Sequence, residues 1–173
     1  MRTIPENHPV SRMFRVMTER AMSQAQLADS QVVLYVSEML LQFLHTDNLF
    51  RYHDKTGERV CHITDMLQMA EQVDAPAKQQ MYQYVGDYVL FVLGVFPESL
   101  QRPRRSSSAT FYAYHGRRSY VAASELQQRS EAVHLYRKMA DHFDRCVLGL
   151  NWFKEYTSDP FYQYMLREFG ISA

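Results

Sequence analysis

Hydrophobic residues along most of the chain recur at steps of three and four positions, the spacing that places them on one face of an α-helix. In residues 10–26, the positions with this spacing are Met13, Phe14, Met17 and Ala21. Residues 30–44 carry a broader apolar stripe, and Asp29 or Ser30 is placed to cap its first turn. The pattern predicts a helix in each of these two segments.

The same spacing predicts five more helices, at residues 64–73, 76–96, 109–128, 130–156 and 160–169. The helix at 76–96 begins with proline, which the first helical turn tolerates, and becomes apolar on nearly every side after Tyr88. Gly86 and Gly94 lie inside it, and each costs ~1 kcal/mol relative to alanine unless a neighbour packs closely there. We therefore expect this helix to be central and buried.

Residues 49–63 have a different pattern. Two short runs, 49–52 and 59–63, flank the sequence Asp-Lys-Thr-Gly, whose Gly57 can adopt a positive φ in a tight turn. These runs predict a small β-hairpin, which would need to pack against the helices because an isolated hairpin is marginal in water.

The predicted fold class is therefore all-α, a compact bundle of about six to seven helices with one small β-hairpin near residues 49–63. We expect a single helical domain spanning residues 1–173, since this length suffices to bury a core. Residues 1–9 are expected to form a lead segment. Residues 102–108 contain only arginine, proline and serine and are expected to form an exposed loop.

Composition narrows the function classes without choosing among them. The formal net charge is zero, which makes nucleic acid an unlikely partner for the whole surface. The longest apolar run, residues 88–96, is shorter than the ~20 residues that a membrane span needs, and residues 1–10 lack the apolar core of a signal peptide. Cys61 and Cys146 show no metal-type spacing. These features predict a cytoplasmic protein with reduced thiols and no membrane partner.

One group of polar residues is expected to face the core. Asp87 lies at helical spacing from apolar positions, and His142 and Cys146 share an apolar stripe one turn apart. The candidate ligand pocket comprises Asp87, Tyr112, His115, Tyr120, His142 and Cys146. A carboxylate held there could perform acid–base chemistry. The preferred interpretation is structural, with Asp87 accepting hydrogen bonds that fix the helix packing.

A second candidate site is a stretch of five arginines between residues 101 and 120 that contains no acidic residue. The candidate anion-binding residues are Arg102, Arg104, Arg105, Arg117 and Arg118. Arginines beside a serine triplet and a helix start could bind a phosphate or polyanion. A solvated loop with salt-bridging arginines is the preferred interpretation.

No metal site and no cofactor are predicted. A di-iron bundle needs two Glu-x-x-His motifs and two further glutamates, and Glu131 with His134 supplies one such motif in the chain. Glu131 is in a first helical turn, where an acid simply favours the helix dipole. Glycine fingerprints for nucleotides and the serine nucleophile elbow are absent from the sequence. Whether any reaction is catalysed therefore stays open, with non-catalytic function preferred.

Three segments carry a resemblance to known sequences: GDYVLFVLGVFPE at residues 86–98, GRRSY at 116–120 and FDRCVLGLN at 143–151. Together they resemble a family of uncharacterised bacterial all-helical proteins, over most of the chain. The resemblance implies a single bacterial helical domain. It carries no activity, ligand or catalytic residue.

Three functional hypotheses follow from the sequence. The first is a non-catalytic interaction or regulatory module that forms a homo-oligomer, most simply a dimer, because aromatic residues, methionine and arginine are enriched at interface cores. The second is a helical bundle, either an enzyme or a binding protein, that binds a small molecule or metal around Asp87, His115 and His142. The third is phosphate or nucleic-acid binding through the arginine-rich stretch.

Overall fold

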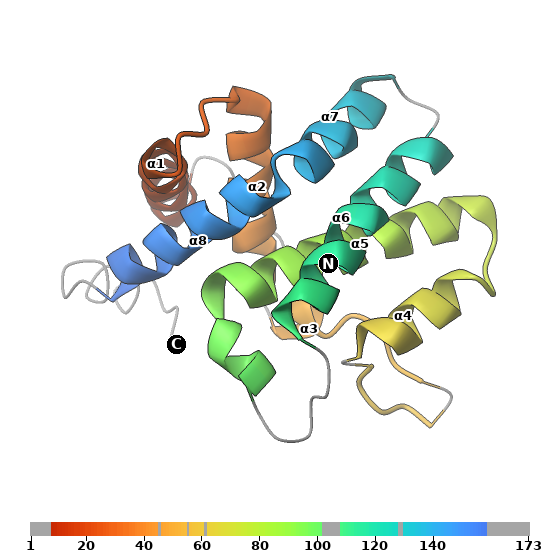
Figure 1. Ribbon diagram of the computed structural model, residues 1–173. Helices are drawn as coiled ribbons and strands as arrows, with labels where there is room; N and C mark the ends of the chain where they lie inside the picture. The colour runs from red at the N-terminus through yellow and green to blue at the C-terminus, as the bar shows by residue number, and fades with distance from the viewer. Residues whose placement is uncertain are drawn as a thin grey trace.

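Eight α-helices and one short 3-10 helix make up most of the residues that the computed structural model describes, which are 8–44, 46–54, 56–60, 62–101, 108–127 and 130–158 (Figure 1). In chain order these are α1 (Pro9–Gln24), α2 (Ser30–Phe43), α3 (Thr46–Leu49), α4 (Ile63–Ala70), α5 (Ala75–Val95), the 3-10 helix η1 (Pro97–Gln101), α6 (Ala109–Leu126), α7 (Ser130–Asp141) and α8 (Phe143–Thr157). The predicted all-α fold is confirmed.

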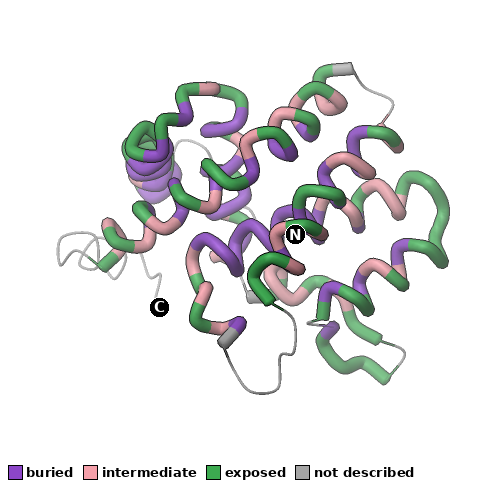
Figure 2. The backbone as a smooth tube through the Cα atoms, in the orientation of Figure 1, coloured by how far each residue is buried: buried purple, intermediate pink, exposed green. Residues whose placement is uncertain are grey.

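Helix α5 lies at the centre of the bundle, as its all-round apolar sequence predicts. The Asp74 side chain caps its start by accepting a hydrogen bond from the Ala77 backbone N–H at 3.0 Å, and Pro76 lies in the first turn. Every residue from 84 to 94 is buried, because α4, α6 and α8 all pack against this helix. Figure 2 shows this stretch as a continuous buried segment.

The remaining helices pack against one another around α5. Helix α1 packs against α8 and α2, while α6 packs against α7 as well as α5.

Both glycines of α5 are close-packing positions, as the sequence suggested. A Cβ on Gly86 would lie 2.9 Å from Cε1 of Tyr120, and a Cβ on Gly94 would overlap the side chain of Leu150. The missing side chains therefore let α6 and α8 approach the central helix.

The predicted β-hairpin is wrong as to its strands, although the turn forms. The described part of residues 49–63 contains a single antiparallel bridge between His53 and Arg59, and no strand. The Asp54 side chain organises the turn by accepting from the Thr56 and Glu58 backbone N–H groups, and Gly57 has a φ of 84°. Two backbone hydrogen bonds still cross the turn, from Asp54 to Glu58 and from Val60 to Tyr52, but the described residues on either side do not extend this pairing into strands.

The helix predicted at residues 130–156 is divided in two at His142. This residue has φ and ψ of −97° and 11°, so α7 ends before it and α8 begins after it. Its backbone N–H still donates to Lys138 and its carbonyl still accepts from Cys146, both at 2.9 Å, so the break is a local irregularity. This division and the short helix α3 account for eight α-helices where six to seven were expected.

Three predicted segments lie outside the described residues. These are most of the lead segment, the arginine–serine loop at 102–107 and the helix at 160–169. In the described part of the chain, no helix combines the length and the apolar character needed to cross a bilayer.

Candidate functional site

The carboxylate of Asp87 accepts hydrogen bonds from two tyrosine hydroxyls on different helices. Asp87 lies near the middle of α5, where its residue surface is 8% exposed. Tyr35 of α2 and Tyr120 of α6 each donate to its Oδ1 atom at 2.7 Å. Hydrogen bonds to an ionised acceptor are stronger than neutral ones, particularly away from water. One carboxylate oxygen therefore joins α2, α5 and α6.

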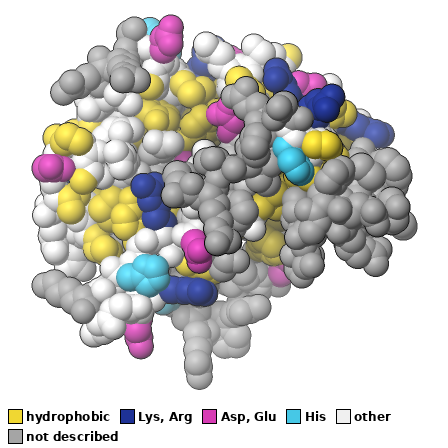
Figure 3. Space-filling view, turned by 180° about the vertical axis from the view of Figure 1, so that it is seen from behind, with side chains coloured by type: hydrophobic (Ala, Val, Ile, Leu, Met, Phe, Trp, Pro, Cys, Tyr) yellow, Lys and Arg dark blue, Asp and Glu magenta, His cyan; other side chains and the backbone are white. Residues whose placement is uncertain are grey.

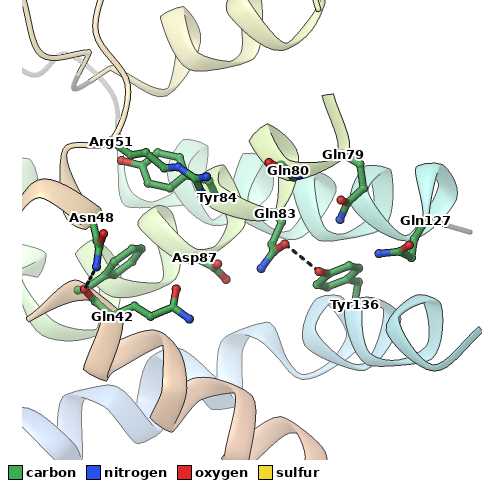
Figure 4. A pocket seen from close by; sticks show the side chains of 11 residues that line it. Gln42, Asn48, Arg51, Gln79, Gln80, Gln83, Tyr84, Asp87, Gln127 and Tyr136 are labelled. Carbon is green, nitrogen blue, oxygen red and sulfur yellow. Dashed lines mark hydrogen bonds between the residues drawn. The ribbon is translucent and has the colours of Figure 1, made fainter. Parts of the chain in front are cut away.

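Gln83, one turn before Asp87, extends this network to α7. Its Nε2 atom donates to the Tyr35 hydroxyl at 3.2 Å. Its Oε1 atom accepts from the Tyr136 hydroxyl at 2.8 Å, the contact drawn in Figure 4. The rings of Tyr35, Tyr120 and Tyr136 pack on one another with centroids 6.2–6.5 Å apart. The polar network is thus enclosed by aromatic rings, which lower the local dielectric.

Burial raises the pKa of Asp87 from 3.8 to about 7. Desolvation disfavours the ionised carboxylate more strongly than the hydrogen bonds from Tyr35, Tyr120 and Gln83 favour it. Burial, and then the charge of Asp87, raise the pKa values of Tyr35 and Tyr120 well above 10, so both hydroxyls stay protonated. Among the described residues, no lysine, arginine or histidine forms an ion pair with Asp87.

Asp87 also lines an open pocket of about 430 Å³, a volume suited to a small organic molecule. Uncharged polar side chains dominate the lining, which includes five glutamines. The lining residues are Gln42, Phe43, Asn48, Arg51, Gln79, Gln80, Gln83, Tyr84, Asp87, Gln127 and Tyr136. In Figure 4 the Asp87 carboxylate lies between the amide ends of Gln42 and Gln83. The carboxylate is therefore both hydrogen-bonded within the helices and presented to a cavity.

The structure brings together part of the predicted ligand group. Tyr120 binds Asp87 directly, and Cys146 is fully buried close enough to influence the pKa of Tyr120. Burial raises the pKa of the Cys146 thiol to about 12, so it stays protonated and unreactive.

The remaining three predicted residues are elsewhere. Tyr112 is buried in the core, where its ring packs on Phe111. The His115 ring packs against the Phe111 ring at an interplanar angle of 57°, with centroids 4.3 Å apart, and partial burial lowers the pKa of His115. His142 lies at the junction of α7 and α8. None of the three lines the Asp87 pocket.

The residues missed by the sequence are Tyr35, Gln83, Tyr136 and the other pocket glutamines. Gln83 could have been found, because it precedes Asp87 by four positions and so shares its helix face. Tyr35 belongs to the apolar stripe of α2, and the sequence around it does not indicate a polar partner. Its role depends on how α2 packs against α5.

The arginine-rich stretch is only partly described. The Nη2 atom of Arg117 donates to both carboxylate oxygens of Asp144, at 2.7 and 2.8 Å, so this arginine already forms an exposed ion pair. Arg118 is exposed. Arg102, Arg104 and Arg105 lie outside the described residues. On the face seen in Figure 3, positive and negative side chains are interspersed among the described atoms.

The histidine, cysteine, aspartate and glutamate residues that the structure describes include no group of three placed to hold a metal ion. Comparison of the chain with protein-family models, with curated proteins and with solved structures finds no match. The site must therefore be interpreted from its own geometry.

Proposed function

We propose that this protein binds a small polar organic molecule in the pocket lined by Asp87. The observation that carries the proposal is the position of the carboxylate, which is buried in a hydrogen-bonded network and yet lines a cavity of about 430 Å³. Binding sites for small molecules combine a preformed hollow with a few fixed polar groups in this way.

The network supports binding because it fixes the position of the carboxylate before any ligand arrives. Tyr35 and Tyr120 hold Oδ1 from two helices, and Gln83 is held in turn by Tyr136. A group held by packed neighbours loses little entropy on binding, which favours affinity. The amides around it both donate and accept hydrogen bonds, so the lining suits a ligand with several polar groups.

A screen by thermal unfolding tests the proposal. The wild-type protein is heated with millimolar amines, amino acids, sugars, nucleosides and carboxylic acids, one class at a time. At least one class should raise the unfolding midpoint by several degrees, because a ligand that binds only the folded state stabilises it. The variant Gln42→Trp, which fills the pocket from an exposed position on α2, should lose this shift.

The matched control is Gln68→Trp, at an exposed position on α4 that does not line the pocket. It should keep the shift that Gln42→Trp loses. The proposal is wrong if no class shifts the wild-type midpoint, or if the two tryptophan variants respond alike.

A homo-dimer through α8 is a second proposal, favoured by two exposed apolar residues. Leu148 and Trp152 are 49% and 42% exposed and lie one turn apart, so they share a face of the helix. Aromatic side chains are enriched at the cores of protein interfaces, and an adjacent exposed leucine would extend the apolar surface around Trp152.

A further inference from the structure

The Asp87 pocket presents one buried negative charge and several neutral groups that accept hydrogen bonds. From this arrangement we propose that its ligand is a small protonated amine whose ammonium group contacts the Asp87 carboxylate. This inference rests on the binding function proposed above and gives the chemical class of the ligand.

The charge balance of the pocket favours a cation. Every partner that donates to Asp87 in the described residues is a neutral hydroxyl or amide. Among the described lining residues Arg51 is the one that is positively charged, but it is exposed, its guanidinium lies 5.9 Å from the centre of the Tyr52 ring, and it forms no ion pair with Asp87. A buried carboxylate without a cation is costly, and an ammonium group brought by the ligand would offset that cost.

The hydrogen-bond geometry leaves room for that ammonium group. Tyr35 and Tyr120 both donate to Oδ1, and Gln83 is a third donor to the carboxylate. An ionised carboxylate has about four acceptor positions, so capacity for a further donor remains. The amide oxygens of the surrounding glutamines offer further acceptors for N–H groups (Figure 4). An ammonium ion has only donors, and this lining supplies the acceptors that it needs.

Aromatic rings complete the site. Phe43, Tyr84 and Tyr136 line the same pocket, and aromatic ring faces attract organic cations. A bare metal ion suits the site less well, because the described residues offer no cluster of charged or imidazole ligands around Asp87. An anionic ligand would be repelled by the carboxylate.

Calorimetric titration of the full chain with two matched probes tests the inference. The probes are 4-aminobutan-1-ol, which is a cation at neutral pH, and butane-1,4-diol, its neutral analogue. At pH 8 the amine should bind the wild-type protein at least tenfold more tightly than the diol. Its affinity should fall several-fold at pH 6, because protonation of Asp87 removes the negative charge.

Variants then assign the effect to Asp87. Asp87→Asn keeps an acceptor for the tyrosine hydroxyls and should weaken amine binding at least tenfold, with the diol unaffected. Asp141→Asn removes an exposed carboxylate outside the pocket and should bind the amine as the wild type does. Gln42→Trp provides a second test that leaves Asp87 unchanged, and it should also abolish amine binding.

The outcomes separate this inference from the function on which it rests. Equal binding of amine and diol, or amine binding that persists in Asp87→Asn, overturns the ammonium contact. If sugars or carboxylic acids shift the wild-type midpoint through the pocket while amines do not, the pocket binds ligands but the inferred class is wrong. If nothing binds in the pocket, both proposals fail.

Discussion

At the scale of single residues, Asp87 shows how a candidate functional group opposes the stability of the fold around it. Its pKa of about 7 lies above the value of 3.8 for an unperturbed aspartate. Between these two values the folded protein keeps a proton that the unfolded chain has lost. The stability that comes from the protonated carboxyl is therefore fully present below about pH 4 and is lost as the pH rises through 7.

The substitution Asp87→Asn should remove this dependence on pH. An amide needs no proton to stay neutral, and its oxygen still accepts from Tyr35 and Tyr120. At pH 8 we expect the free energy of unfolding of the variant to exceed that of the wild type by roughly 1–3 kcal/mol. At pH 5 the difference should be smaller. Urea unfolding at pH 5, 6, 7 and 8 measures both curves.

Two features keep this test specific. Tyr35, Tyr120 and Tyr136 face the carboxylate from three other helices, and all three have raised pKa values, so none titrates in this range. The control Asp141→Asn, at an exposed carboxylate, should give a curve parallel to that of the wild type. Parallel curves for Asp87→Asn would contradict the raised pKa of Asp87.

If Asp87→Asn gains stability and loses ligand binding, it shows the trade-off between stability and activity that is expected of a functional residue.

At the scale of elements, the site depends on how closely the helices approach α5. Gly86 lies against the Tyr120 ring, whose hydroxyl reaches Asp87 on the same helix. Gly94 lies against Leu150 of α8, and Gly116 of α6 lies between Phe143 and Val89. At Gly86 this close approach accompanies the 2.7 Å hydrogen bond from the Tyr120 hydroxyl to the Asp87 carboxylate.

The substitution Gly94→Ala tests this packing. The new methyl group would overlap Leu150, and both helices would have to shift. We expect a loss of about 1–3 kcal/mol in free energy of unfolding, even though alanine is the better helix former by up to ~1 kcal/mol. Chemical denaturation monitored by circular dichroism measures the change.

The control for this prediction is Gln80→Ala, at an exposed position on the same helix. It should change stability by no more than about 0.5 kcal/mol. If Gly94→Ala stabilises the protein, then helix propensity outweighs the overlap and the close-packing interpretation is wrong.

The elements were predicted unevenly, for a physical reason that His142 illustrates. The apolar pattern of residues 130–156 is continuous, and His142 is neither glycine nor proline, so nothing local marks a break. The break separates a helix that packs on α6 from one that packs on α1 and α5. Such a division depends on tertiary contacts. The cap at Asp29, by contrast, was predicted from the sequence because it acts on its own first turn.

At the scale of the whole molecule, the proposed dimer can be measured with the protein's own fluorophore. Trp152 is the chain's single tryptophan and lies on the exposed face of α8. If two copies associate there, light scattering at micromolar concentration should give twice the monomer mass of 20.4 kDa. Tryptophan emission should shift to shorter wavelength as concentration rises, because association removes water from the ring.

Leu148→Lys should abolish both signals by placing a charge in the interface. Val73→Lys is the matched control, since Val73 is 40% exposed in the turn between α4 and α5, far from α8 in Figure 1. A monomer at these concentrations, or equal effects of the two lysines, would remove the case for this interface.

The sequence by itself determined the helical class, the central position of α5 and the burial of Asp87, because apolar periodicity and composition act through local geometry. It also marked the turn at Gly57, whose positive φ needs little more than its neighbours. Only the tertiary structure decided that this turn has no strands, that Tyr35, Tyr120 and Tyr136 meet around one carboxylate, and that a cavity opens beside it. These features depend on the distances between helices far apart in the chain. The spacing of residues within one helix does not determine those distances.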